Sequence, residues 1–427
     1  MSEIKTLNTS AFRQQQESEP EWLYDLQRSA WDSYSEMPLP DRVVHLWKYT
    51  EPEKFVPMGS EQLLSLLPLK ANGHGKNAYP VPAGESAIAY NDSSLLTLAN
   101  LSEEAKSKGV VLVDLATAAQ EHSDLVKEYL GSAVGEDFDK FEALNLAVWN
   151  TGLFLYVPKG VTLDNPVHLH RTPGNSETFL RLLVVAGENS EFTVVDDYQS
   201  RQSSARLNSV VELIANDSAR VKFATVIRLE EQEQLFLTQR NRIGRNVQLK
   251  SSAVSIGGGV VKVNWGTLLE GQGADSRWTG VLLGGDEQHF DNHTIHRHVA
   301  GETYSNLEFK VALQGRAVSA YTGRIRIEEH AANCQAYQEN RNLLLSDTAK
   351  VESIPELEII NDEVKCSHGV TVGMIEPEQI FYLSSRGIDP QEAVQIILEG
   401  FFEEPLAEVP ALVKNISRDL LLQKLGR

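Results

Sequence analysis

Turn-forming residues recur at a constant interval in the middle of this 427-residue sequence. Four clusters follow one another 28 residues apart, at Asn189-Ser190, Asp217-Ser218, Arg245-Asn246 and Gly273-Ala274. Similar segments at a fixed period of about 20 to 50 residues are typical of stacked repeats, in which each unit buries its apolar face against the next. The interval therefore predicts a chain wound into coils, a β-solenoid. The repeat is degenerate, so a β-sandwich also fits this pattern.

Inward and outward residues alternate strictly between the turn clusters. The runs that show this are 220–225, 261–265 and 307–313. Their apolar positions include Val221, Phe223, Val261, Val263, Trp265, Leu307, Phe309, Val311 and Leu313, and polar residues such as Arg220, Lys222, Lys262 and Asn264 stand between them. Period-two alternation is typical of strands that bury one face. Residues 151–375 are therefore predicted to form a β-rich core.

The sequence before this core, residues 1–150, has mixed and mainly helical signals. Residues 21–35 carry a weakly amphipathic pattern that begins after Pro20. Residues 110–113 form a short apolar strand candidate, and residues 116–130 are predicted as one helix.

The sequence after the core, residues 376–427, is predicted to be helical. Residues 376–386 predict a helix that ends at Gly387, and Pro390 is suited to begin the next one. A third helix is marked by apolar residues at helical spacing: Val409, Val413, Ile416 and Leu420.

Composition limits the partners and the compartment. The net charge of −20 argues against a general basic surface for nucleic acid or anionic membranes. No apolar run approaches the ~18 to 20 residues needed to cross a bilayer, and the polar residues 1–20 lack the apolar segment of a secretory signal. Two cysteines cannot form a disulfide framework. We expect a protein of the cytoplasm, or of an equivalent organelle compartment, that binds neither nucleic acid nor membrane.

One of the two cysteines, Cys366, stands two residues before His368 in an extended segment. Side chains at i and i+2 of a strand point to the same face, so this thiol and this imidazole can address one ion. Such donors suit zinc, iron and iron–sulfur units. Two ligands are at best half of a closed tetrahedral site. On chemistry alone, the alternative is a cysteine packed as a small hydrophobe beside a hydrogen-bonded histidine.

A second group of chemically active residues is dense in histidine: His289, His293, His296 and His298. On a strand, His296 and His298 share a face, and with Asp291 they could form a metal site. Histidines that only donate and accept hydrogen bonds in a solenoid are the stronger interpretation. The other cysteine, Cys334, is predicted to pack as a small hydrophobe.

Two segments near the end of the chain, VKCSHG at 364–369 and FYLSSRGI at 381–388, resemble the SufD branch of the SufB/SufD family. These proteins are subunits of the scaffold complex in iron–sulfur cluster assembly. Further similar segments are PLPD (38–41), LWKYT (46–50), FEALNLAVW (141–149), YVPKGV (156–161) and YQENRNLLLSD (337–347). The resemblance runs from Pro20 to the final helices. It implies a mainly β fold, a right-handed parallel β-helix between helical ends, and so decides against the β-sandwich.

The choice between the SufB branch and the SufD branch of this family depends on one position. In the SufB branch an assembly cysteine closely follows a Gly-Asp pair, and the corresponding residue here is Ala349. The resemblance to SufD-type chains implies instead that His368, with Cys366 beside it, contributes to a transient iron–sulfur cluster at the interface with a SufB-like subunit.

The same resemblance implies a second partner and a mechanism. A SufC-like ABC-type ATPase would dock on residues 376–427 and would alone bind ATP, and its nucleotide cycle would shift the two scaffolds. The chain itself would be a non-catalytic subunit, with a homodimer as the alternative when it is isolated, and the sequence leaves the participation of a flavin open. The rival function is a carbohydrate-active β-helix enzyme, a lyase or hydrolase, which would need an acidic cleft lined by successive coils.

Overall fold

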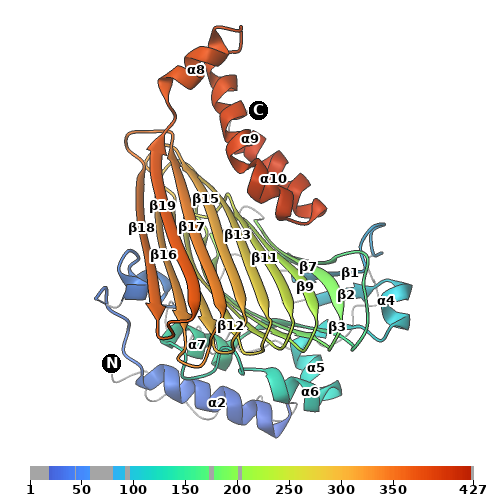
Figure 1. Ribbon diagram of the computed structural model, residues 1–427. Helices are drawn as coiled ribbons and strands as arrows, with labels where there is room; N and C mark the ends of the chain where they lie inside the picture. Colours follow the sequence, from blue (N-terminus) through green and yellow to red (C-terminus); the bar gives the residue numbers. More distant parts are fainter. Residues whose placement is uncertain are drawn as a thin grey trace.

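Strands alternate between two sheets throughout the central part of the chain, so that two consecutive strands make one coil (Figure 1). This computed structural model describes residues 19–43, 45–57, 80–91, 97–172, 177–200 and 204–424. Most of the polar stretch 1–20, on which the prediction of no secretory signal depends, lies outside the described residues.

The helices are, in chain order, α2 (Glu21–Glu36), the 3₁₀ turns η3 (His45–Trp47) and η4 (Pro52–Phe55), α4 (Glu103–Ser107), α5 (Leu115–Glu121), α6 (Ser123–Tyr129), α7 (Lys140–Val148), α8 (Pro377–Ser384), α9 (Pro390–Glu408) and α10 (Ala411–Lys424). The strands are β1 (Ala87–Asn91), β2 (Thr97–Leu101), β3 (Val111–Asp114), β4 (Thr151–Val157), β5 (Val167–Arg171), β6 (Glu177–Ala186), β7 (Glu191–Gln199), β8 (Arg206–Ala215), β9 (Arg220–Arg228), β10 (Gln234–Ile243), β11 (Gln248–Ser255), β12 (Val260–Leu269), β13 (Asp275–Gly284), β14 (His289–His298), β15 (Tyr304–Leu313), β16 (Val318–Ile327), β17 (Cys334–Leu344), β18 (Lys350–Ile359) and β19 (Val364–Met374).

The two sheets share one topology. Sheet A has the order β19-β17-β15-β13-β11-β9-β7-β5-β1-β2, and sheet B has the order β18-β16-β14-β12-β10-β8-β6-β4-β3. Neighbouring strands run parallel, except that β1 with β2 and β3 with β4 are antiparallel. This is a parallel β-helix with helices at both ends, so the predicted mainly β fold class is confirmed.

The turn clusters found in the sequence lie on top of one another. Residues with positive φ occur once per coil at one corner: Gly160, Asn189, Ser218, Asn246, Gly273, Glu302 and Asn333. The backbone N–H of Asn189 donates to Asp217 O at 3.0 Å, and that of Ser218 donates to Arg245 O at 2.7 Å, one coil further on. The step along this corner is 27 to 31 residues rather than a constant 28, because strand and turn lengths vary. The predicted period therefore arises from turns that stack from coil to coil, each with one residue in the left-handed backbone conformation.

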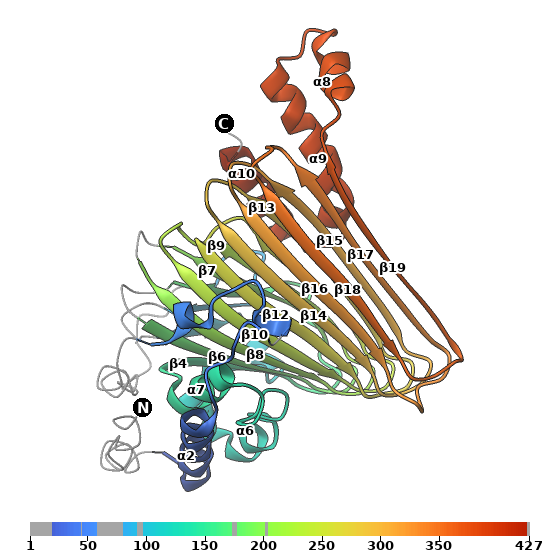
Figure 2. The same cartoon turned by 90° about the vertical axis from the view of Figure 1, so that its left-hand side faces the viewer.

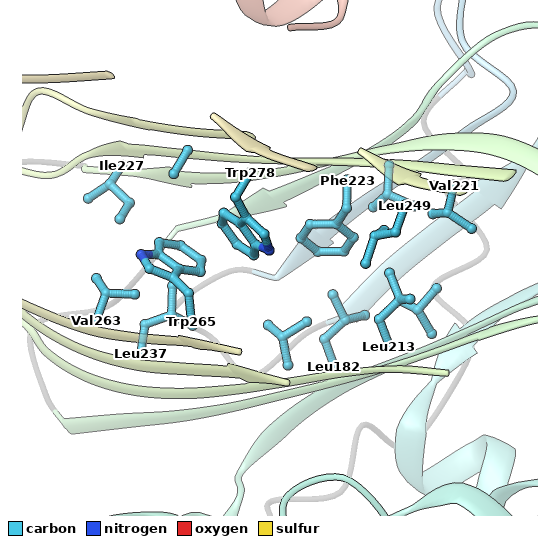
Figure 3. Close-up of a cluster of buried hydrophobic side chains, with 14 of the residues drawn as sticks. Leu182, Leu213, Val221, Phe223, Ile227, Leu237, Leu249, Val263, Trp265 and Trp278 are labelled. Carbon is cyan, nitrogen blue, oxygen red and sulfur yellow. The ribbon is translucent and has the colours of Figure 1, made fainter. Parts of the chain in front are cut away.

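Apolar side chains from both sheets fill the inside of the coils (Figure 3). Trp265 of β12 and Trp278 of β13 meet there with ring centroids 4.8 Å apart. The predicted inward positions are confirmed, but the outward ones are not uniformly exposed. Lys262 is fully buried, and so is Ala224, which follows the inward Phe223 and therefore has an outward position. Segments from the two ends of the chain cover the outer faces of the sheets at these positions.

The N-terminal helices cover the outer face of sheet B at its first coils. Helix α2 packs on α7, and α7 packs on β6 and β8. The residues predicted as one helix at 116–130 form two, α5 and α6, which break at His122. Glu212 of β8 joins this layer to the sheet, because it accepts hydrogen bonds from the backbone of residues 131–134 and pairs with Arg181 at 2.6 Å.

Residues 45–57, here called the strap, cross sheet B further along. The ring of Trp47 stacks on Phe236 of β10 with centroids 5.7 Å apart. Thr50 donates to Asp291 of β14 at 2.5 Å, and Asp291 also pairs with the buried Lys262 at 2.8 Å. The strap thereby explains how a lysine can be buried at an outward position.

The C-terminal helices α9 and α10 cover the outer face of sheet A (Figure 1). Leu398 and Phe402 of α9 belong to one apolar cluster with Val226 and Val281 of that sheet. Helix α8 projects beyond the sheets, as Figure 2 also shows, with Phe381 and Tyr382 73% and 57% exposed. No helix within the described ranges combines the length and apolarity that a bilayer span requires.

Candidate metal site at the last coil

The last coil consists of β18 and β19, the terminal strands of sheets B and A (Figure 2). Among the described strands, β19 is hydrogen-bonded to β17 alone, with Ala336 opposite Cys366 and Gln338 opposite His368. Val364 and Cys366 pack against the core inside the coils. Because strand side chains alternate, His368 is on this inward face too. The two residues predicted as ligands therefore share a face at the open end of the β-helix.

The two donors differ in exposure. Cys366 is half-buried, whereas His368 is exposed. Burial raises the pKa of the Cys366 thiol, a backbone hydrogen bond from Ala336 lowers it, and Cys334 raises it again. The thiol is therefore protonated at neutral pH unless a cation approaches it. The group of three potential metal ligands found within the described residues contains neither Cys366 nor His368, so the pair can supply only part of a site.

The inward face of β17 next to this pair is polar, which the sequence analysis missed. Gln338, Asn340 and Asn342 lie at i, i+2 and i+4 and are all buried. Asn342 donates to Asn340 Oδ1 at 2.7 Å, and Ser353 of β18 donates to the same oxygen at 2.9 Å. Gln338 Oε1, Asn340 Nδ2 and Asn342 Oδ1 have no hydrogen-bond partner among the described residues. Buried polar atoms left unpaired at an open end can be satisfied by a ligand, water or another chain.

The other sulfur-related positions do not add a ligand here. Cys334 is fully buried, and its thiol is hydrogen-bonded to Thr303 Oγ1 at 3.0 Å. Ala349 is buried in the core cluster just before β18. Both cysteines are free.

The histidine-rich strand β14 is divided between two faces. His296 and His298 point into the coil, where His296 Nε2 lies 2.8 Å from Ser276 Oγ and His298 lies 2.7 Å from Thr303 Oγ1. Burial lowers the pKa of His296 to about 3 and that of His298 to about 4, so both are neutral. Asp291 lies on the opposite face, beneath the strap. The three side chains that would have formed a metal site are not brought together, because 291 and 296 are an odd number of positions apart.

A different group of ligands lies on the outer face of sheet A, and the sequence analysis missed it as well. His168 and His170 of β5 and Asp197 of β7 each offer one ligand atom, and these atoms lie within 4.8 Å of one another. Asp197 and Glu85 raise the pKa of His168 against the effect of burial, whereas burial lowers that of His170 to about 4. The His-x-His spacing was the signal that could have found it.

Carboxylates on successive coils are paired with arginines of the neighbouring coil. Examples are Arg245 with Asp217 at 2.6 Å and Arg326 with Glu358 at 2.8 Å, each one coil apart. A carbohydrate-cleaving β-helix would instead present such carboxylates in a cleft, so these pairs do not favour the rival function.

The chain matches two family models that together span most of its length. Residues 169–401 match the SUF system FeS cluster assembly, SufBD core domain, and residues 5–169 match the SufBD protein N-terminal region. The iron–sulfur cluster assembly protein SufD of Bacillus subtilis is 31% identical over 94% of this chain and 93% of its own length. SufBD family proteins of Staphylococcus haemolyticus and Staphylococcus epidermidis are 26% identical over 92% of this chain and 87% of theirs. The chain therefore belongs to the SufBD family of iron–sulfur cluster assembly proteins.

Proposed function

We propose that this chain is a non-catalytic, SufD-type subunit that pairs with a SufB-like scaffold and a SufC-like ATPase to build and transfer nascent iron–sulfur clusters. The observation that carries the proposal is the position of Cys366 and His368. They share the inward face of the terminal strand, where a second chain can reach them. The cluster is the cargo of this site and is shared with the partner.

The unpaired edges of the last coil support an interface with a second subunit. Strands β18 and β19 end the two sheets and expose backbone N–H and C=O groups that another chain can pair with. Several apolar residues at this end are also exposed: Ile359, Ile360, Val370, Val372 and Met374. A SufB-like β-helix that stacks here would cover them. In its absence, we expect the same edges to pair with a second copy.

The donor chemistry supports a site for building clusters rather than storing them. His368 would ligate iron through a neutral imidazole while the partner supplies a thiolate, and Cys366 would support it as a ligand or neighbour. An arrangement with mixed ligands, completed only at an interface, comes apart when the two chains shift. The SufD branch is supported by Ala349 at the position that corresponds to the SufB cysteine and by the name of the Bacillus subtilis relative.

The C-terminal helices support docking of an ATPase. Phe381 and Tyr382 expose their rings on α8, which projects away from the sheets. Helix α9 is joined to sheet A by Lys310, which pairs with Glu404 at 2.8 Å. A movement of α8 and α9 driven by ATP on the partner would therefore be transmitted to the coils. We place the complex in the cytoplasm, because a reducing compartment keeps both cysteines free.

The test is His368→Ala in the complex co-purified with the SufB-like and SufC-like subunits. Iron and acid-labile sulfide per complex should fall to background while the subunits still co-purify, because the sheet edges and the exposed apolar residues of the last coil remain available for association. Ser367→Ala is the matched control, since Ser367 is exposed on the same strand but on the opposite face. Iron and sulfide contents unchanged by His368→Ala would reject the ligand role.

A further inference from the structure

The group His168, His170 and Asp197 lies far from the last coil. Strand β7 is six strand positions away from β19 in sheet A, which corresponds to about 29 Å at ~4.8 Å per strand. The three residues belong neither to the last coil nor to the terminal helices. They are a separate feature of the outer face.

The backbone places all three residues on one patch of this face. His168 and His170 are i and i+2 on β5, so their side chains project to the same side. Asp197 is directly opposite His170 on the neighbouring strand. Asp197 is fully buried, His168 is 5% exposed and His170 is half-buried, so the patch can be approached from the side of His170.

One ligand–ligand distance already matches a coordination polyhedron. His168 Nε2 is 3.4 Å from Asp197 Oδ2, close to the ~3.4 Å edge of a tetrahedron with metal–ligand bonds of ~2.0 to 2.1 Å. Gln199 Nε2 lies 2.6 Å from His170 Nδ1 and 2.7 Å from Asp197 Oδ2. The side-chain amide of Gln199 therefore lies between the ring nitrogen of His170 and the carboxylate oxygen of Asp197, where a cation would contact both atoms.

The surrounding residues fix the orientation of each of the three side chains. Glu85 Oε1 is 3.3 Å from His168 Nδ1, which leaves Nε2 directed at Asp197. A carboxylate behind a histidine is the usual support of a metal-bound imidazole. Arg228 fixes Asp197 with two hydrogen bonds of 2.9 and 2.7 Å, and the ring of Tyr90 stacks on His170 with centroids 4.6 Å apart.

The charges leave room for a divalent cation. Asp197 and Glu85 carry two negative charges and Arg228 one positive charge, so the set is anionic when both imidazoles are neutral. Glu85 Oε2 is buried and has no hydrogen-bond partner among the described residues. A second imidazole, that of His170, lies beside this set with its ring centroid 3.8 Å from that of His168.

We propose that His168, His170 and Asp197 form a mononuclear site for a borderline divalent cation such as Fe²⁺ or Zn²⁺. Two imidazoles and one carboxylate are the donors that these ions accept, and they leave further coordination positions for water or an incoming ligand. Gln199 would move aside or turn its amide oxygen to the ion. This site stands on its own geometry and is independent of the function proposed for His368.

The test uses Co²⁺ as a spectroscopic probe on the purified full chain stripped with a chelator. The chain carries Cys366→Ser, so that the half-buried thiol of the last coil cannot contribute. We expect about one Co²⁺ per chain with d–d bands of nitrogen and oxygen ligation and without a thiolate charge-transfer band, displaced by Zn²⁺. His170→Gln and Asp197→Asn should each weaken Co²⁺ binding by more than ~100-fold, the upper end of what loss of an outer-sphere partner costs.

His330→Ala is the control, because His330 is exposed in a turn and should leave Co²⁺ binding unchanged. Circular dichroism melts separate loss of binding from loss of folding. If Asp197→Asn fails to fold, the half-buried His170→Gln alone decides. Co²⁺ binding that survives His170→Gln, or a folded parent chain that binds no Co²⁺ at millimolar concentration, would overturn the proposal.

Discussion

Replacing Glu142 with Gln should stabilise the protein more strongly as the pH rises. Glu142 of α7 is fully buried and accepts a hydrogen bond from Thr238 of β10 at 2.6 Å. Its pKa is raised from 4.5 to about 7, first by burial and then by Asp139, against the hydrogen bond from Thr238. The folded chain therefore keeps a proton that the unfolded chain releases above pH 4.5.

The sign and the size of the effect of pH on stability follow from the difference between the pKa of Glu142 in the folded and in the unfolded chain. Stability falls as the pH rises from 4.5 to about 7, because the unfolded chain binds fewer protons there. The pKa difference of about 2.5, at ~1.4 kcal/mol per pKa unit, costs the wild type about 3 kcal/mol above pH 7. Gln mimics the protonated acid and does not titrate. Its advantage over the wild type should therefore grow by about 2 kcal/mol between about pH 5.5 and about pH 8.

The assay is urea unfolding of both proteins at the two pH values. The lower value stays above the sequence pI of about 5.0, where solubility is lowest. Glu121→Gln, an exposed residue at the end of α5, is the control and should show no such growth. A stability difference between Glu142→Gln and the wild type that is the same at both pH values would refute the reasoning.

Two further changes test the packing of the chain and its open end. Glu212→Ala should lower the free energy of unfolding by about 3 to 5 kcal/mol in urea melts, because it leaves the buried Arg181 without its partner; a loss below about 1 kcal/mol, as for an exposed ion pair, would contradict this. Val372→Lys places a charge on the exposed inward face of β19 and should weaken co-purification with the SufB-like subunit by ~10-fold or more without lowering the melting temperature. Undiminished co-purification of Val372→Lys would remove β19 from the interface.

The sequence predicted the coils because their signals are local. Asn189, Ser218, Asn246 and Gly273 each adopt the left-handed conformation once per coil, and short polar residues and glycine reveal such turns. Lys262 was misjudged because its outward position predicts exposure, whereas Leu46 O and Asp291 surround it. Nothing near residue 262 indicates that a segment more than 200 positions away covers it.

For the candidate sites too, the sequence predicted what depends on local pattern and missed what depends on neighbouring coils. The shared face of Cys366 and His368 followed from strand alternation alone, and the polar residues opposite them required the register of β17. Asp197 is 29 residues after His168 and 27 after His170, which is one coil. The period that predicted the fold would have located this third ligand, had it been applied to histidines and carboxylates as well as to turns.

The one-coil spacing of neighbouring strands also bears on how the chain folds. Neighbouring strands are about 30 residues apart in a chain of 427 residues. Their relative contact order, the sequence separation divided by the chain length, is therefore about 0.07, against about 0.16 to 0.22 for all-β sandwiches and barrels. Each coil can therefore join the previous one as synthesis proceeds from the N-terminus. The strap must wait longer, since Thr50 meets Asp291 only after 241 residues. The coil that carries Cys366 and His368 is the last one to be synthesised. Its unpaired strand edges, which can pair with another chain, are therefore formed only after the other coils.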